Sequence, residues 1–188
     1  MILRPVRPHP SLTESPLVKI LNTLLLGAAL IGPGIGIGNA QPAATAVTPT
    51  APLQTLRLQA HNMVGEQFGV DALQGKVAIV FFWSTACAVC RDSLPELRSN
   101  LAGWRDKPFA LVTVNVDAKA SDWLAYESIL SKTKTPPKNL YPLRQDEGRL
   151  VPPTLPLTLL VNAQGKVVAR FEGRLAPEAW DGVADLLP

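Results

Sequence analysis

Hydrophobic residues follow two different periods along this chain, and their alternation predicts an α/β domain. The continuous apolar run Val77 to Trp83 is typical of a central strand that is covered on both faces, and Phe109 to Val116 predicts a second apolar strand. Between them, Ser93 to Trp104 carries apolar residues at helical spacing, which predicts a helix with one buried face. This order favours a central mixed β-sheet flanked by helices.

Weaker patterns predict the outer elements of this sheet. Leu56, Leu58 and Ala60 alternate with polar neighbours, which indicates a half-buried strand over 53–60, and a return at 66–68 would complete an N-terminal β-hairpin extension. The other expected elements are a helix over 123–131 capped by Ser121 and Asp122, a polar loop over 132–138, strands over 157–162 and 166–171 joined by a turn at 162–165, and a closing helix over 177–187.

The first 52 residues differ in composition from the rest of the chain. Residues 1–40 place basic residues ahead of an apolar stretch that ends at small residues, which is the pattern of a secretory signal peptide. A retained N-terminal membrane anchor is the alternative, although Gly32-Pro33-Gly34 would break a membrane-spanning helix. Residues 41–52, rich in Ala, Thr and Pro, predict a linker, and 53–188 predict one exported domain, periplasmic or tethered to the cytoplasmic membrane.

Charge gives little information about partners. The whole chain carries a net charge of +3, but beyond residue 40 it has 15 basic residues against 14 acidic ones. No basic cluster with interleaved aromatic residues occurs in this part of the sequence, so nucleic-acid binding has no support. A membrane contact is expected only through the N-terminal segment, if that segment is retained.

Cys87 and Cys90 are the only cysteines, and they form a C-x-x-C directly after the apolar run that ends at Trp83. A helix beginning there would stabilise a thiolate on Cys87, the expected nucleophile, while Cys90 lies one turn further and can resolve a mixed disulfide. A structural cross-link is the alternative, but so short a loop removes little chain entropy. Zinc would need four ligands, and only His9 and His61 are available in addition to the cysteines.

The segment from Phe82 to Arg91 resembles the active site of the thioredoxin superfamily, most closely that of exported proteins of the TlpA and ResA type. The resemblance covers about residues 53–187, because three further segments follow in the expected order: Gly75 to Val77, Val114 to Asp117, and Leu155 to Val161 with Gly165-Lys166. It implies a thioredoxin-like fold and a redox-active disulfide in place of any external cofactor. It also implies a cis bond between Leu155 and Pro156 beside the disulfide, where Leu155 would bind a client peptide.

Three departures from this family pattern change the expected site. Ala86 stands where a Trp usually precedes the first cysteine, so the surface beside Cys87 should be more open. Phe81 and Ser93 occupy the two positions at which related proteins place an acid, so Cys90 has no assigned base. Trp83 ends the central strand beside the active-site turn, and we group it with Ala86 among the residues expected at the substrate site.

The resemblance implies an exported thiol–disulfide oxidoreductase that reduces cysteine-containing client proteins, such as apocytochrome c, and is recharged by a membrane electron donor. A peroxiredoxin-like peroxidase is one alternative, although the Pro-x-x-x-Thr-x-x-Cys order is missing. A copper-binding metallochaperone of the Sco type is another, but that family uses C-x-x-x-C and a distant His. A non-catalytic thioredoxin-fold interaction protein is the third.

Overall fold

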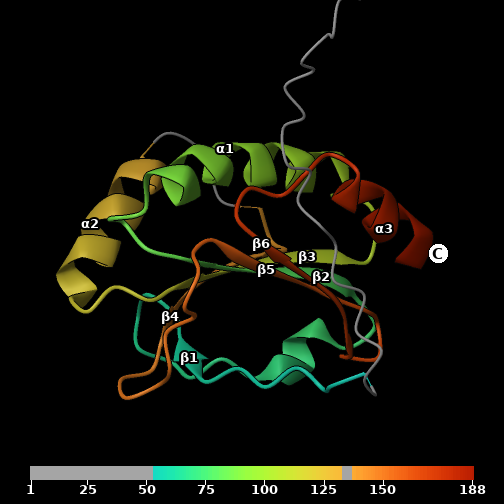
Figure 1. Ribbon diagram of the computed structural model, residues 1–188. Coiled ribbons are helices and arrows are strands. Elements are labelled where there is room, and N and C mark those ends of the chain that lie inside the picture. Colours follow the sequence, from blue (N-terminus) through green and yellow to red (C-terminus); the bar gives the residue numbers. More distant parts are fainter. Residues whose placement is uncertain (1–52, 133–136) are drawn as a thin grey trace, which may run out of the picture. The chain divides into compact units, whose positions relative to one another are not determined.

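The computed structural model describes residues 53–132 and 137–188. Its six strands form one mixed sheet in the order β1-β4-β3-β2-β5-β6 (Figure 1). The strands are β1 (Ala60–His61), β2 (Val77–Trp83), β3 (Phe109–Asn115), β4 (Leu140–Gln145), β5 (Leu157–Val161) and β6 (Val167–Glu172). The helices are the 3-10 helix η1 (Val70–Leu73) and the α-helices α1 (Ala88–Gly103), α2 (Ala120–Ser131) and α3 (Ala179–Leu186). The leader predicted over 1–40, the linker over 41–52 and part of the polar loop, 133–136, lie outside the described residues.

Strand β2 lies inside the sheet, as its continuous apolar sequence predicts. It pairs in parallel with β3 and antiparallel with β5. Its side chains alternate between two hydrophobic clusters: Ile79 and Phe81 belong to the cluster that includes α1, and Ala78 and Val80 belong to the cluster on the opposite face. All four are fully buried, so both faces of β2 are covered.

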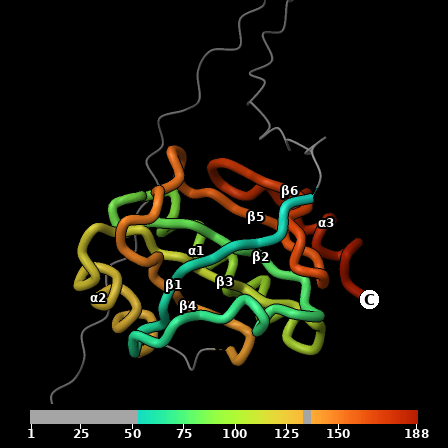
Figure 2. Tube along the Cα trace, turned by 90° about the horizontal axis from the view of Figure 1, so that it is seen from below, coloured from blue at the N-terminus to red at the C-terminus, as the bar shows by residue number. Residues whose placement is uncertain are grey.

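Different segments cover the two faces of the sheet. Helices α1, α2 and α3 lie on one face (Figure 1). Residues 53–73, which contain β1 and η1, lie across the other face (Figures 1 and 2). The helix-side core includes Leu94, Leu97 and Val183, and the opposite core includes Leu56 and Leu73. The predicted mixed sheet flanked by helices is confirmed, but all three α-helices lie on one face, and residues 53–73, with only the short 3-10 helix η1, cover the other.

The predicted strand over 53–60 is wrong in its extent, because β1 has only two residues. Thr55 forms an isolated bridge with Lys166 next to β6, whereas Ala60 pairs with Gln145 of β4 at the other edge of the sheet. The chain between them therefore crosses the sheet (Figure 2). Leu56 and Ala60 are buried. The alternation of apolar residues reflects this one-sided packing rather than pairing along a strand.

The N-terminal hairpin return exists in a short form. The N–H of Asn62 donates to the carbonyl of Glu66 at 2.9 Å, and the N–H of Phe68 donates to the carbonyl of Ala60 at 2.8 Å. His61 and Gln67 form an isolated antiparallel bridge. The hairpin is thus a tight turn at the end of β1 with a single bridge.

Strand β4 has no counterpart in the sequence-based prediction. It contains Pro142, and its buried and exposed residues do not alternate regularly. A proline inside a strand argues for an edge position, because it cannot donate a ladder hydrogen bond. Strand β1 pairs only with Arg144 and Gln145, so Pro142 lies where β4 has no second neighbour.

Helix α2 begins earlier than its predicted cap. Lys119 occupies the N-cap position without a side-chain hydrogen bond, and Ser121 and Asp122 lie inside the first turn. The Asp122 carboxylate there still interacts favourably with the positive end of the helix dipole. Helix α1 includes the residues with helical spacing and begins at Ala88, directly after Cys87, as expected for a helix that starts at the C-x-x-C. Helix α3 agrees with its predicted range within the usual uncertainty of helix ends. Among the described residues, no helix has both the length and the apolar character needed to cross a bilayer.

A partly buried ion pair joins α1 to α2. Arg98 Nη2 donates to Glu127 Oε2 at 3.2 Å, and the Glu127 side chain is only 5% exposed. Burial raises the pKa of Glu127, and the guanidinium of Arg98 opposes this shift. The Glu127 carboxyl therefore binds a proton more tightly in the folded protein than in the unfolded chain. Its contribution to the free energy of unfolding falls as the pH rises from 4.5 through the raised pKa of the folded protein.

We expect Arg98→Met to lower the free energy of unfolding by about 3 kcal/mol at pH 7. This is the low end of the range for breaking a buried ion pair, because the Arg98 side chain is partly exposed. The loss should shrink toward pH 5, because a protonated Glu127 needs no cationic partner. Urea unfolding followed by circular dichroism at several pH values measures both effects. Adding Glu127→Gln should recover most of the loss at pH 7, and a loss independent of pH would contradict the ion-pair explanation.

Candidate active site

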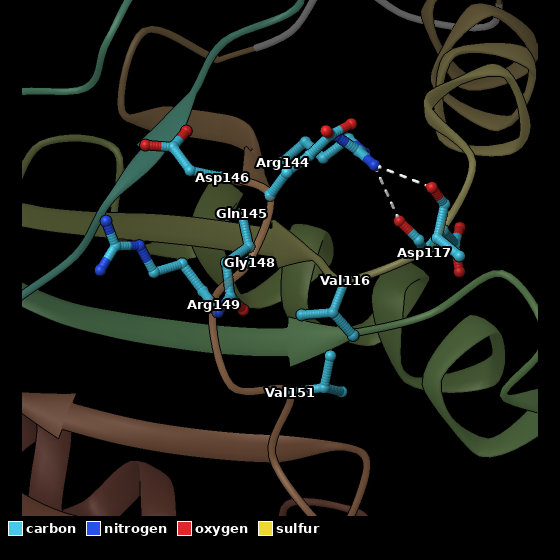
Figure 3. Close-up of a pocket in the computed structure, with 10 residues that line it drawn as sticks. Val116, Asp117, Arg144, Gln145, Asp146, Gly148, Arg149 and Val151 are labelled. Atoms are coloured by element: carbon cyan, nitrogen blue, oxygen red, sulfur yellow. Dashed lines mark hydrogen bonds and ion pairs between the residues drawn. The ribbon is translucent and has the colours of Figure 1, made fainter.

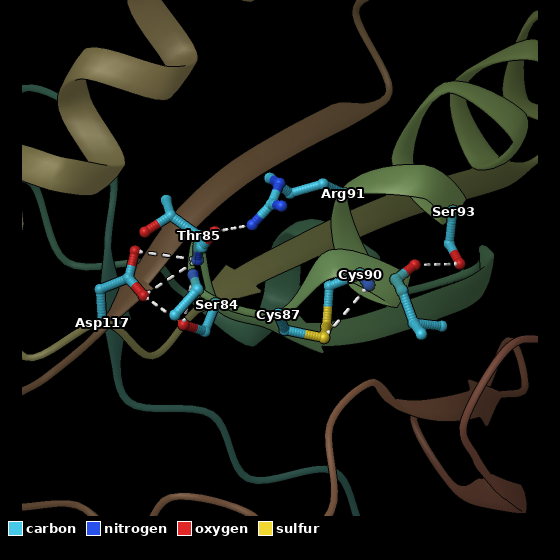
Figure 4. Close-up of a disulfide and its surroundings, with 9 residues drawn as sticks. Ser84, Thr85, Cys87, Cys90, Arg91, Ser93 and Asp117 are labelled. Carbon is cyan, nitrogen blue, oxygen red and sulfur yellow. Dashed lines mark hydrogen bonds between the residues drawn. A yellow bond between two sulfur atoms is a disulfide. The ribbon is translucent and has the colours of Figure 1, made fainter.

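The C-x-x-C lies where β2 meets α1. Strand β2 ends at Trp83, and α1 begins at Ala88 with Cys87 as its N-cap residue. Cys87 and Cys90 form a disulfide in the structure (Figure 4). Because β2, β3 and β4 run in parallel, the segments that follow all three strands meet at the same edge of the sheet. The disulfide therefore lies where polar groups from distant parts of the sequence converge.

The two sulfurs occupy different environments. Cys87 is partly exposed, and its sulfur accepts the Cys90 backbone N–H at 3.1 Å (Figure 4). Cys90 is fully buried and belongs to the helix-side core. Free N–H groups and the positive end of the helix dipole favour a thiolate at Cys87, whereas burial disfavours a charge on Cys90. This geometry matches a nucleophile at Cys87 and an internal thiol at Cys90.

A carboxylate anchors the segment between Trp83 and Cys87. Asp117, two residues beyond β3, accepts the Ser84 hydroxyl at 2.5 Å and the Thr85 backbone N–H at 3.0 Å (Figure 4). Asn115 Nδ2 also donates to this carboxylate at 2.9 Å. Sequence reasoning noted the strand that ends at Asp117 but missed this contact. A polar Asn-x-Asp directly after a buried strand was the available signal.

The predicted peptide-binding proline lies close to the same core. The bond between Leu155 and Pro156 is cis, as the resemblance implies. Leu155 and Cys87 are both partly buried against the helix-side core, and Pro156 is buried. The carbonyl of Pro156 accepts the Gly173 N–H at 2.8 Å, which ties the cis-proline segment to the end of β6.

Trp83 and Ala86 differ in accessibility. Ala86 is exposed, which fits the expectation of an open surface beside Cys87. Trp83 is fully buried, with its ring centroid 5.0 Å from that of Tyr126. A buried ring cannot contact a client peptide, so the grouping of Trp83 with substrate-binding residues is wrong. Trp83 instead belongs to the helix-side core, where it packs against Tyr126 of α2.

The two positions that lack acids are buried and uncharged. Phe81 is part of the helix-side core, and the Ser93 hydroxyl donates to the Val89 carbonyl within α1 at 2.8 Å. Of the nearby acids, Asp92 is exposed and Glu96 forms an ion pair with Arg174 at 2.9 Å. Both acids are therefore accessible to solvent rather than part of the helix-side core.

A small pocket of about 180 Å³ borders the anchoring carboxylate at the ends of β3 and β4 (Figure 3). Val116, Asp117, Arg144 and Val151 are among the residues that line it. Asp146 lies on its rim, where a hydrogen bond from His61 lowers the pKa of the carboxyl group. In the described part of the chain, no cluster of three or more His, Cys, Asp or Glu side chains could hold a metal ion.

Comparison with known proteins identifies the family. A model of the AhpC/TSA family matches residues 47–179. The chain belongs to the AhpC/TSA family. This assignment and the fold confirm the resemblance to thioredoxin-like proteins of the TlpA and ResA type. In this class the reacting group is a redox-active disulfide of the chain rather than an external cofactor. No curated protein sequence matches the chain.

Solved structures share the fold at low sequence identity. A thiol:disulfide interchange protein from a Bacteroides species is 25% identical, with a TM-score of 0.52 over 64% of this chain and 80% of its own. The thioredoxin domain of a thiol-disulfide oxidoreductase from Bacteroides vulgatus is 21% identical, with a TM-score of 0.54 over 73% and 100%. The exposed lipoprotein thioredoxin Etrx1 from Streptococcus pneumoniae is 19% identical, with a TM-score of 0.55 over 69% and 98%.

The different environments of the two sulfurs predict selective alkylation. After reduction of the disulfide, we expect iodoacetamide to modify Cys87 at least about tenfold faster than Cys90, because Cys87 is partly exposed at a helix N-terminus and Cys90 is buried. Mass spectrometry of peptides from partially alkylated protein gives the ratio. The preference should disappear in urea, and equal labelling of the native protein would contradict the assignment.

Proposed function

We propose that this protein is an exported thiol–disulfide oxidoreductase that reduces disulfide bonds of client proteins. The observation that carries the proposal is the pairing of a partly exposed Cys87 at a helix N-terminus with a buried Cys90 that is within disulfide-bonding distance. Family membership supports redox chemistry at this pair. The names of the similar structures support thiol–disulfide exchange as the reaction.

The proposed reaction starts from the reduced protein. The Cys87 thiolate attacks one sulfur of a client disulfide and forms a mixed disulfide, while the other client sulfur leaves as a thiolate. Cys90 then attacks Cys87, which closes the internal disulfide and releases the second client sulfur. We infer that this leaving thiolate takes the Cys90 proton, because Phe81 and Ser93 stand where related proteins have an acid. The client gains two electrons, and the protein is left oxidised.

The cycle requires a reductant that opens the Cys87–Cys90 disulfide again, and we propose a membrane electron donor of the thiol–disulfide type. The intervening residues, Ala88 and Val89, add neither a His nor a Pro beside the thiolate. We therefore expect a moderately reducing to intermediate couple, between about −270 and −180 mV. Equilibration with glutathione buffers measures this potential.

The alternative functions are less well supported by the contacts at the site. In a peroxidase, the hydroxyl of Ser84 or Thr85 would have to form a hydrogen bond at the reacting Cys87. The Ser84 hydroxyl instead donates its hydrogen to Asp117. A copper-delivery site would add a histidine to the cysteines. His61 lies at the β4 edge of the sheet beside Asp146, rather than at the disulfide.

We expect Cys87→Ser to lower the rate of disulfide reduction by at least about a hundredfold, because a serine hydroxyl is a weak nucleophile at neutral pH. Cys90→Ser should instead accumulate mixed disulfides, because the resolving thiol is missing. Insulin reduction and non-reducing electrophoresis measure the two effects. Wild-type activity in Cys87→Ser would rule out this mechanism, and a pair that no glutathione ratio reduces would indicate a structural cross-link.

We also propose export through the N-terminal segment, and Etrx1, named as an exposed lipoprotein, is consistent with such a location. When the full chain is produced in a bacterium, we expect the mature protein to begin at Gln41 and to reach the periplasm. N-terminal sequencing of cell fractions tests this. An intact chain in the membrane fraction would favour the anchor, and an intact chain in the cytosol would contradict export.

A further inference from the structure

The segment that presents Cys87 is held by hydrogen bonds at each of its residues. The Ser84 hydroxyl donates to Asp117 and accepts the Ala86 N–H at 3.1 Å, while the Ser84 carbonyl accepts the Cys87 N–H at 3.1 Å. The Thr85 N–H donates to Asp117 at 3.0 Å, and the Thr85 carbonyl accepts the Arg91 guanidinium (Figure 4). The Asp117 carboxylate thus attaches this segment to the turn that follows β3.

The backbone that carries Asp117 is itself fixed by a second side chain. Arg144 lies on β4 opposite Asn115 of β3, and its side chain is only 6% exposed. Its Nη2 donates to the carbonyl of Asp117 at 3.1 Å and to the carbonyl of Ala118 at 3.2 Å (Figure 3). A buried guanidinium that bonds two successive carbonyls restricts the turn after β3. Its contact with the exposed Glu147 is looser, at 3.9 Å.

We propose that Asp117 and Arg144 are positioning residues for the reaction of Cys87. Arg144 restrains the turn after β3. From that turn, Asp117 binds Ser84 and Thr85 and so sets the position and orientation of Cys87 beyond the end of β2. Neither residue needs to touch a client. This inference rests on the proposed thiol–disulfide exchange only for its biological purpose, because its effect is measurable on the cysteine pair itself.

The physical effect expected from this anchor concerns closure of the disulfide. Reduction breaks the bond between the two sulfurs. If residues 84–86 stay anchored, the Cys87 sulfur remains beside the Cys90 N–H, and the disulfide can form again with little loss of conformational entropy. Without the carboxylate, the reduced segment gains conformations that the oxidised ring does not have. Loss of Asp117 should therefore disfavour the disulfide relative to the dithiol, which makes the pair more oxidising.

The test compares Asp117→Ala with Asp117→Asn by equilibration of the Cys87–Cys90 pair with glutathione. We expect Asp117→Ala to lower the equilibrium constant for disulfide formation about tenfold, as for one lost charge-assisted hydrogen bond, which corresponds to a potential about 30 mV less negative. Asp117→Asn keeps an oxygen acceptor for Ser84 and Thr85, so its change should be less than about threefold. Equal changes in both variants would overturn positioning in favour of a purely electrostatic effect.

Two further variants approach the same contact from other sides. Ser84→Ala deletes the partner on the active-site segment, and Arg144→Met frees the turn after β3, so both should shift the equilibrium constant in the same direction as Asp117→Ala. Ser84→Ala also keeps the proposal testable if Asp117→Ala does not fold. Asp106→Ala is the matched control, because this exposed carboxylate bonds only the neighbouring Arg105 among the described residues, and it should leave the constant unchanged.

Thermal unfolding of the oxidised proteins separates positioning from general stability. A lower melting temperature with an unchanged glutathione equilibrium in Asp117→Ala and Ser84→Ala would overturn the proposal. If the wild-type pair equilibrates with glutathione but reduces no client disulfide, only the proposed function is refuted. The equilibrium constants of the variants can still be measured on the cysteine pair itself. The two hypotheses can therefore fail independently.

Discussion

The burial of β2 on both faces is the constraint on which the rest of the structure depends. Its larger side chains, such as Ile79 and Phe81, fill the helix-side cluster, and the smaller Ala78 and Val80 fill the opposite one, so a one-residue shift in register would exchange the two sets and disrupt the packing of both clusters. Its end at Trp83 is therefore fixed, and α1 starts five residues later. So short a connection leaves Cys87 at the helix N-terminus and Cys90 inside the core. The chemical difference between the two sulfurs follows from this packing.

The polar groups around the disulfide are used mainly to hold the backbone. The Ser93 hydroxyl bonds the Val89 carbonyl within α1, the Ser84 hydroxyl bonds Asp117, and Arg144 bonds two carbonyls of the next turn. None of these contacts delivers a proton to a sulfur. The proposed reaction would therefore rely on the helix N-terminus and on the geometry of the pair, since positions 81 and 93 carry no acid.

Sequence patterns predict the parts of this structure whose cause is local. The two apolar segments identify β2 and β3, and the C-x-x-C identifies the cysteines that form the disulfide, because each signal lies within a few neighbouring positions. Strand β4 was missed because Pro142 and an irregular pattern hide a strand that lies at the edge for most of its length. Trp83 was wrongly grouped with the substrate site, because its place at the end of the strand does not show that its ring packs against Tyr126 of α2.

The anchor at Asp117 marks the limit of such reasoning. Its partner Ser84 is 33 residues away, and the Arg144 that fixes its backbone lies 27 residues further along, so no local period connects them. They meet because three parallel strands end at one edge of the sheet, a property of topology. Folds of this kind recur at 25% identity or less, and fold alone does not determine function. The functional argument must therefore rest on the cysteine pair and on the contacts that hold it in place.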